Sequence, residues 1–252
     1  MTLLALDFDG VLCDSARETG ITGWKAAGAL WEDMAAPMPP QALLDAYCRT
    51  RGVLETGYEA ILMMRLLADG EDPDALLETF PQRLQEVIAR SGRDAADLKR
   101  LYGGTRDRWL QDDPQEWLSL SPLYPGAAEI LSDLPPGAGC CIVTTKEERF
   151  VRQLLEYNGI HFAAENIFGL DRGMRKEAIL RNLLALQPDR SVHLVEDRLE
   201  TLKRFLTQPD LAAVRLHLAC WGYNGDAERR EAERLKIHLL RALSLAEILS
   251  ME

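Results

Sequence analysis

The sequence predicts an α/β protein, a doubly wound parallel sheet with an all-helical domain inserted after its first strand. Short apolar runs that stop at polar residues recur at Leu3–Leu6, Gly139–Thr144 and Val192–Val195, as expected for buried parallel strands. Helical patterns separate the later runs, and this alternation is typical of a parallel sheet with helices on both faces. Residues 15–122 show helical periodicity and no convincing strand pattern.

The inserted block follows the first strand and its loop. Apolar residues at three- and four-residue steps predict helices over 17–35, 41–50, 55–69, 73–102 and 104–119. Asp72 and Pro73 are typical of a helix start, with Asp72 as the N-cap and Pro73 at the first helical position. We therefore expect an α/β domain formed by residues 1–14 and 123–252, and a helical domain formed by residues 15–122.

After the insertion, the turn Tyr124–Gly126 opens a helix and the α/β pattern resumes. The expected elements are the strand Gly139–Thr144, helices over Glu147–Tyr157 and Arg175–Leu186, the strand Val192–Val195, a helix through Phe205, the strands Val214–Cys220 and Lys236–Leu240, and a closing helix over Leu245–Leu249. The charge run Asp226–Arg234 is interpreted as a solvated helix or loop.

Composition limits the classes of partner. The 252 residues are 47% hydrophobic, enough for a buried core. The formal net charge of −11 argues against nucleic acid and requires any anionic ligand to be held by local positive groups. Five cysteines without disulfide-framework spacing are interpreted as reduced thiols of a cytoplasmic protein. The chain shows neither a signal-peptide pattern nor an apolar run of transmembrane length, so we expect no membrane partner.

The first strand leads into a pair of carboxylates. Asp7 and Asp9 project to the same side where this strand ends, at the edge of the sheet where open α/β folds bind ligands. Two crowded carboxylates repel each other, and a divalent cation such as magnesium removes that penalty. Gly10 allows a sharp turn and offers an unshielded amide to an anion. The alternative interpretation is an ordinary acidic turn, because Asp and Gly are common turn residues.

The later strands also end in reactive groups. Thr144 and Thr145 follow a strand, where a hydroxyl can bind a phosphate oxygen or simply cap the next helix. Lys176 opens a helix against the helix dipole, which indicates a task such as neutralising Asp7 and a phosphoryl oxygen, with Arg175 as the rival. Glu196 and Asp197 end a third strand and can reach the same cation as Asp7.

These motifs together resemble the haloacid-dehalogenase-like (HAD) superfamily, and within it the phosphoglycolate-phosphatase-like group with a helical C1-type cap. Asp7-Phe8-Asp9-Gly10-Val11 is similar to its first motif, Thr144 to the second, Lys176 to the third and Glu196-Asp197 to the acidic fourth. Pro122–Gly126 and Trp221–Tyr223 also resemble stretches of this group. Val11, Thr145 and Thr201 depart from the residues most frequent there, and Thr201 replaces an Asp, which makes Glu196 the expected second acidic contact.

The resemblance implies a HAD-like core and a magnesium-dependent phosphatase that acts on a small phosphorylated metabolite. Asp7 is the implied nucleophile that forms an aspartyl-phosphate, and Asp9 the general acid and base. The implied magnesium ligands are Asp7, the Asp9 carbonyl and Asp197, with Glu196 beside them. Thr144, Lys176, the Gly10 amide and the hydroxyl of Thr145 are the expected phosphate ligands.

Three alternatives remain at this point. A dehalogenase attacks carbon with Asp7 alone, and the presence of Asp9 argues against it. A sugar phosphomutase uses the same residues but needs a phosphorylated activator. A catalytically silent phosphate-binding protein of the same fold is the alternative that is not an enzyme, and the complete motif set argues against it.

Specificity is expected to come from the helical block. Arg49 and Arg51 interrupt its periodicity near glycines, and Tyr58 follows. Arginine forks suit carboxylate and phosphate groups, so one of these arginines, with Tyr58 beside it, is a candidate ligand for the non-reacting end of the substrate. The alternative is that both arginines are exposed surface residues, as most arginines are.

Overall fold

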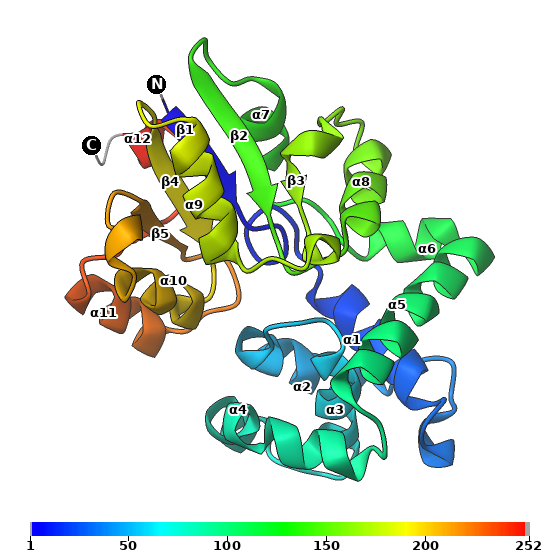
Figure 1. Cartoon of the computed structure of the whole chain (residues 1–252). Helices are drawn as coiled ribbons and strands as arrows, with labels where there is room; N and C mark the ends of the chain where they lie inside the picture. Colours follow the sequence, from blue (N-terminus) through cyan, green and yellow to red (C-terminus); the bar gives the residue numbers. More distant parts are fainter. Residues whose placement is uncertain (1, 250–252) are drawn as a thin grey trace. The chain divides into compact units, whose positions relative to one another are not determined.

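The computed structural model of the protein describes residues 2–249. The chain divides into two compact units, one formed by Met1–Asp14 with Pro122–Glu252 and the other by Ser15–Ser121. We call the first the α/β unit and the second the helical unit. Figure 1 shows the sheet of the α/β unit and, in blue to green colours, helices α1 to α6 of the helical unit (Figure 1).

The α/β unit contains one sheet whose paired strands are all parallel. Its strands are β1 (Thr2–Leu6), β2 (Ala138–Val143), β3 (Ile167–Phe168), β4 (Ser191–Glu196), β5 (Arg215–Ala219) and β6 (His238–Leu240). Their spatial order is β3-β2-β1-β4-β5-β6, which confirms the predicted doubly wound sheet. The strand order reverses between β1 and β4, so the carboxyl ends of these two strands flank the switch point where such folds bind ligands.

One face of the sheet is covered by α9 (Lys176–Leu186) and α10 (Leu199–Leu206) (Figure 1). Leu3 and Ala5 of β1 pack with Val192 and Leu194 of β4 in the apolar cluster beneath these helices. Side chains alternate along a strand, so the next positions on this same face are Asp7 and Glu196. The alternation that builds the core therefore also directs two carboxylates to the same side of the sheet.

The remaining helices of this unit are α7 (Ala127–Ser132), α8 (Glu148–Tyr157), α11 (Asp226–Arg234) and α12 (Leu245–Leu249), with short 3₁₀ turns at Ala164–Asn166, Leu170–Arg172 and Pro209–Leu211. The charge run Asp226–Arg234 is thus a helix, and only its Ala232 is buried. The two-residue edge strand β3 was not predicted, because a strand so short has no alternation to detect.

The helical unit contains α1 (Ala16–Ala27), α2 (Gln41–Thr50), α3 (Glu59–Ala68), α4 (Pro73–Arg90), α5 (Ala95–Asp112) and α6 (Pro114–Ser119), with 3₁₀ turns at Glu32–Met34 and Arg51–Val53. Its core forms around α3, where the five consecutive residues Ala60–Met64 are fully buried. A helix that is apolar on all sides is typical of the centre of a helical domain. Helices α1, α2 and α4 pack against α3.

The prediction of one helix over 73–102 and another over 104–119 was wrong. Gly92 has a φ of +67° just after α4 ends, and Asp94 caps α5 by accepting a hydrogen bond from Asp97 N at 2.7 Å. Gly103 lies inside α5, where its small size fits a buried position. The cap and the left-handed glycine decide the boundary, whereas glycines within a helix cost only about 1 kcal/mol each.

A buried ion pair joins helices of this unit. Glu18 on α1 has no exposed surface and receives two hydrogen bonds from Arg106 on α5, at 2.9 and 2.6 Å. Trp117 of α6 donates to the same carboxylate at 2.9 Å. Removing one member leaves a buried charge without its partner, which typically costs about 3–5 kcal/mol. This contact fixes the packing of α1, α5 and α6.

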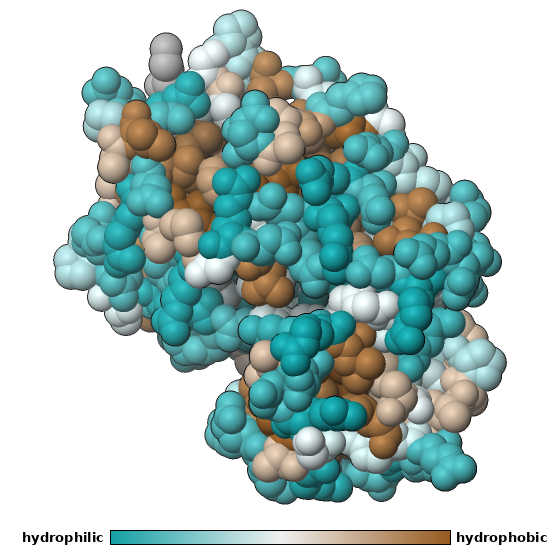
Figure 2. Space-filling view, turned by 45° about the vertical axis from the view of Figure 1, so that its right-hand side comes forward, coloured by the Kyte–Doolittle hydropathy of each residue, from teal (hydrophilic) through white to brown (hydrophobic). Residues whose placement is uncertain are grey.

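Among residues 2–249, no helix combines the length and the apolar character that crossing a bilayer requires. Hydrophilic residues cover most of the face seen in Figure 2, and hydrophobic residues there form separate groups.

Candidate active site

Asp7 stands at the centre of the acidic edge of the sheet. It follows β1 directly, and its amide still pairs with the carbonyl of Val195 at 2.9 Å. The side chain is buried, and its Oδ1 accepts a hydrogen bond from the amide of Phe8 at 2.8 Å. The strand register thus holds the carboxylate in one orientation at the switch point of the sheet.

Lys176 is the cation beside Asp7. As the first residue of α9, it places its Nζ 3.0 Å from Asp7 Oδ1 and 2.6 Å from Glu196 Oε2. Its side chain is buried, whereas the rival Arg175 is exposed. The structure therefore brings Lys176, and not Arg175, to the acidic cluster.

The charges at this position oppose one another. Burial, and to a smaller extent the charge of Glu196, raise the pKa of Asp7 to about 7 against the opposing effect of Lys176. Burial alone lowers the pKa of Lys176, but the charges of Asp7 and Glu196 outweigh it and raise that pKa above its ordinary value. Lys176 is therefore a stable cation, and it leaves the negative charge around Asp7 only partly neutralised.

Asp7, Glu196 and Asp197 form a buried acidic cluster. One carboxylate oxygen from each lies within 4.8 Å of the others. Hard oxygen ligands at this spacing fit a divalent cation such as magnesium, and the one ammonium group of Lys176 does not balance three carboxylates. The donor set therefore fits the predicted metal. The carboxylate of Asp9 is outside this group, and its carbonyl as a ligand stays a prediction.

Asp9 instead pairs with a lysine that the sequence analysis did not select. Lys146 Nζ lies 2.9 Å from Asp9 Oδ1, and the lysine side chain has no exposed surface. Lys146 comes two residues after Thr144, in the loop between β2 and α8. The sequence could have indicated Lys146, because it closely follows a buried strand that ends at this edge of the sheet.

Asp197 follows β4 directly and is hydrogen-bonded by the loop after β5. The amide of Tyr223 donates to Asp197 Oδ2 at 2.8 Å, and the amide group of Asn224 donates to the Asp197 carbonyl at 2.9 Å. Gly10, with a φ of +84°, and Gly222 both lie against Asp197, where a Cβ would come 2.1 and 2.4 Å from its atoms. Two glycines thus allow two loops to enclose one carboxylate.

Thr144 lies at the end of β2 and is buried. Its Oγ1 accepts a hydrogen bond from the amide of Lys146 at 3.1 Å. The N-cap of α8 is Glu147, so the capping role that we considered for Thr144 does not apply. Thr145 follows and is half-buried.

The candidate specificity residues belong to the helical unit. Arg49 is exposed near the end of α2, while Arg51 is buried and donates to the carbonyl of Leu54 at 3.2 Å. Tyr58, just before α3, is also buried. The alternative that both arginines are surface residues is therefore wrong for Arg51. Their contact with a substrate stays a prediction.

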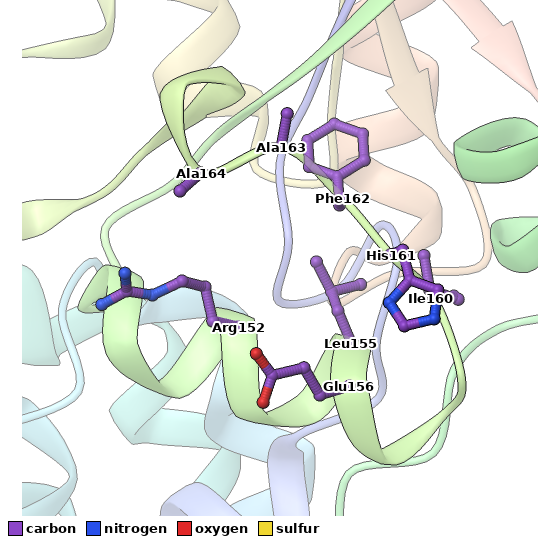
Figure 3. A pocket seen from close by; sticks show the side chains of 8 residues that line it. All are labelled: Arg152, Leu155, Glu156, Ile160, His161, Phe162, Ala163 and Ala164. Carbon is purple, nitrogen blue, oxygen red and sulfur yellow. The ribbon is translucent and has the colours of Figure 1, made fainter.

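A separate hollow of about 380 Å³ lies on the α/β unit, between α8 and the following loop (Figure 3). Arg152, Leu155 and Glu156 of α8 line one side of it. Residues 160–164 line the other. None of the predicted site residues lines this hollow.

Comparison with known proteins gives similarity in structure only. No family model and no curated protein matches the sequence. A predicted phosphatase from Clostridium acetobutylicum aligns with a TM-score of 0.60 and 16% identity over 99% of this chain and 98% of its own. A predicted phosphoglycolate phosphatase from Haemophilus somnus aligns with a TM-score of 0.58 and 14% identity, over 100% of this chain and 97% of its own. The chain has the haloacid-dehalogenase-like fold. A haloacid dehalogenase-like hydrolase from Streptococcus pneumoniae aligns with a TM-score of 0.55 and 14% identity, over 100% of this chain and 98% of its own.

Proposed function

We propose that the protein is a magnesium-dependent phosphatase that hydrolyses a small phosphorylated metabolite through an aspartyl-phosphate on Asp7. The observation that carries this proposal is the contact of Asp7 with Lys176 inside a buried group of three carboxylates. The group lies at the carboxyl ends of β1 and β4, the edge where doubly wound sheets typically bind ligands, and this supports the proposal. Structures similar in fold include predicted phosphatases, which is consistent with the same chemistry.

In the first half of the reaction, Asp7 attacks phosphorus in line with the leaving oxygen. A bond forms between an Asp7 oxygen and phosphorus while the bond to the leaving oxygen breaks. Asp9 gives its proton to that oxygen, and the product leaves as an alcohol. In the second half, Asp9 takes a proton from water as the water oxygen attacks phosphorus. Inorganic phosphate leaves, and Asp7 is a carboxylate again.

The other buried residues bind the phosphoryl group. The ammonium of Lys176 and the hydroxyl of Thr144 offer donors to its equatorial oxygens, and the amide of Gly10 adds one more. Asp7, Glu196 and Asp197 would hold the magnesium ion, with Asp9 contributing its carbonyl. When bound, that cation supplies positive charge that stabilises the negative transition state.

The helical unit is assigned the role of a cap that selects the substrate. The chain leaves the α/β unit at Asp14, a few residues after Asp9, and returns at Pro122. A domain inserted there is connected directly to the catalytic loop, and a cap that closes excludes water from the reaction. We expect magnesium and a phosphate analogue together to protect the helical unit from limited proteolysis. Identical cleavage with and without them would contradict closure.

The test of the activity is phosphate release from p-nitrophenyl phosphate by the purified protein. We expect turnover with magnesium and loss of turnover in excess chelator. Failure to release phosphate under any metal condition would overturn the proposal. A requirement for a phosphorylated sugar activator would instead indicate a phosphomutase.

A further inference from the structure

The buried contact between Lys146 and Asp9 has no part in the scheme above. Lys146 Nζ lies 2.9 Å from Asp9 Oδ1, with the lysine side chain fully buried and the Asp9 side chain 14% exposed. Desolvating an ammonium group is expensive, and a buried ion pair seldom repays that cost in stability. The pair therefore has a weak justification as a stabilising contact. The position of Asp9, two residues after Asp7, indicates that the pair has a role in the reaction.

The backbone of Lys146 is fixed on several sides. Its amide donates to Thr144 Oγ1 at 3.1 Å, and its carbonyl accepts from the amide of Leu170 at 3.0 Å. Gly169 packs so closely that a Cβ there would come 2.7 Å from the same carbonyl. The Nζ also lies 5.8 Å from the centre of the Phe8 ring. The long side chain thus starts from an anchored backbone and brings its Nζ to a carboxylate oxygen of Asp9.

The two buried lysines have separate partners. Lys176 contacts Asp7 and Glu196, whereas Lys146 contacts Asp9. Asp9 therefore has its own cation and does not depend on the one that serves the nucleophile.

We propose that Lys146 is a positioning residue that orients Asp9 for proton transfer to the leaving group. This inference rests on the proposed function, in which Asp9 is the general acid and base. An ammonium group has three donors and no acceptor, so Lys146 can only donate to Asp9, and its contact with Oδ1 orients the carboxyl group relative to the leaving group. Holding one oxygen fixes the direction of the other, and orientation of this kind is a large part of acid catalysis. Lys146 itself exchanges no proton in the reaction.

The test compares two substrates of nearly equal shape. Nitrophenolate leaves p-nitrophenyl phosphate without needing a proton, whereas phenolate, whose conjugate acid resembles a tyrosine side chain with pKa about 10, leaves phenyl phosphate slowly unless it is protonated. We expect Lys146→Met to lower kcat/KM for phenyl phosphate about tenfold more than for p-nitrophenyl phosphate, because general acid catalysis typically contributes about 10²–10⁴-fold. Lys146→Arg keeps the charge and should restore part of the difference.

Two controls separate positioning from folding. Lys203→Met removes a partly exposed lysine of α10 that pairs with Glu200 and Glu231, and it should change neither rate. In an Asp9→Asn background, Lys146→Met should not alter the ratio of the two rates further, because Lys146 acts through Asp9. If Lys146→Met does not fold, Lys146→Gln, which keeps one donor, is measured in its place.

Equal losses on both substrates, or a changed ratio in the Asp9→Asn background, would overturn the role of Lys146. This result is distinct from failure of the proposed function. In that case the wild-type protein itself releases no phosphate from either substrate.

Discussion

Acidification should destabilise the α/β unit through one buried histidine. His217 on β5 has no exposed surface, and its ring stacks between those of His193 and His238, with centroids 5.1 and 5.3 Å apart. Its Nε2 lies 3.0 Å from Nδ1 of His193, while its Nδ1 has no hydrogen-bond partner among the described residues. Because a buried N–H without an acceptor is costly, we infer that Nε2 carries the proton of His217 and donates to His193.

The size of this loss of stability follows from the pKa of His217. Burial, with smaller contributions from His193, His238 and Arg215, lowers this pKa from 6.5 to about 3. The unfolded chain therefore takes up a proton near pH 6.5, and the folded protein does not until about pH 3. Stability is fully present above pH 6.5 and is lost as the pH falls through this window. Between pH 7 and pH 5 the free energy of unfolding should fall by about 2 kcal/mol from this group.

Urea unfolding at several pH values measures this effect. His217→Phe keeps a ring in the stack but cannot take up a proton, so its free energy of unfolding should depend on pH less steeply than that of the wild type. Comparing slopes removes the constant cost of the substitution. His161→Gln changes an exposed histidine and should keep the wild-type slope. Parallel pH dependences for wild type and His217→Phe would refute the reasoning.

Three further outcomes are expected. Asp197→Ala should weaken magnesium binding at least about tenfold in calorimetry, and Glu196→Ala less, because Lys176 already neutralises Glu196; equal affinities for both variants would contradict this. Gly222→Ala should lower both the thermal midpoint and phosphatase activity, because its Cβ would lie 2.4 Å from Asp197 Cβ, whereas Gly225→Ala, with nothing within 4 Å, should leave both close to wild type. Arg49→Ala should impair turnover of the natural substrate more than that of p-nitrophenyl phosphate, which has no anionic tail. Equal losses on both substrates would show that Arg49 does not bind the substrate.

The central part of the fold was predictable because its signals are local. The apolar run before Asp7 and the run before Glu196 each mark a buried parallel strand and the polar residue that ends it. Alternation then places both carboxylates on one face without knowledge of the rest of the chain. Lys176 was identifiable for a similar reason, since a lysine that opposes the helix dipole needs a compensating anion.

Other features depend on contacts between distant segments. The partner of Asp9 lies 137 residues away in Lys146, and no periodicity connects the two. Arg51 is likewise buried in the helical unit, although no local pattern of the sequence predicts this. The boundary between α4 and α5 was misplaced near residue 103, whereas the capping carboxylate of Asp94 decides it.

The measurement that tests the central claim most directly is the identification of the phosphorylated residue. The protein is mixed with p-nitrophenyl phosphate and magnesium, quenched rapidly and treated with borohydride, which reduces an acyl phosphate to an alcohol. Mass spectrometry should then find homoserine in place of Asp7, and Asp7→Asn should give neither this product nor phosphate release. Phosphate release by Asp7→Asn at the wild-type rate, or reduction at a different aspartate, would contradict the account.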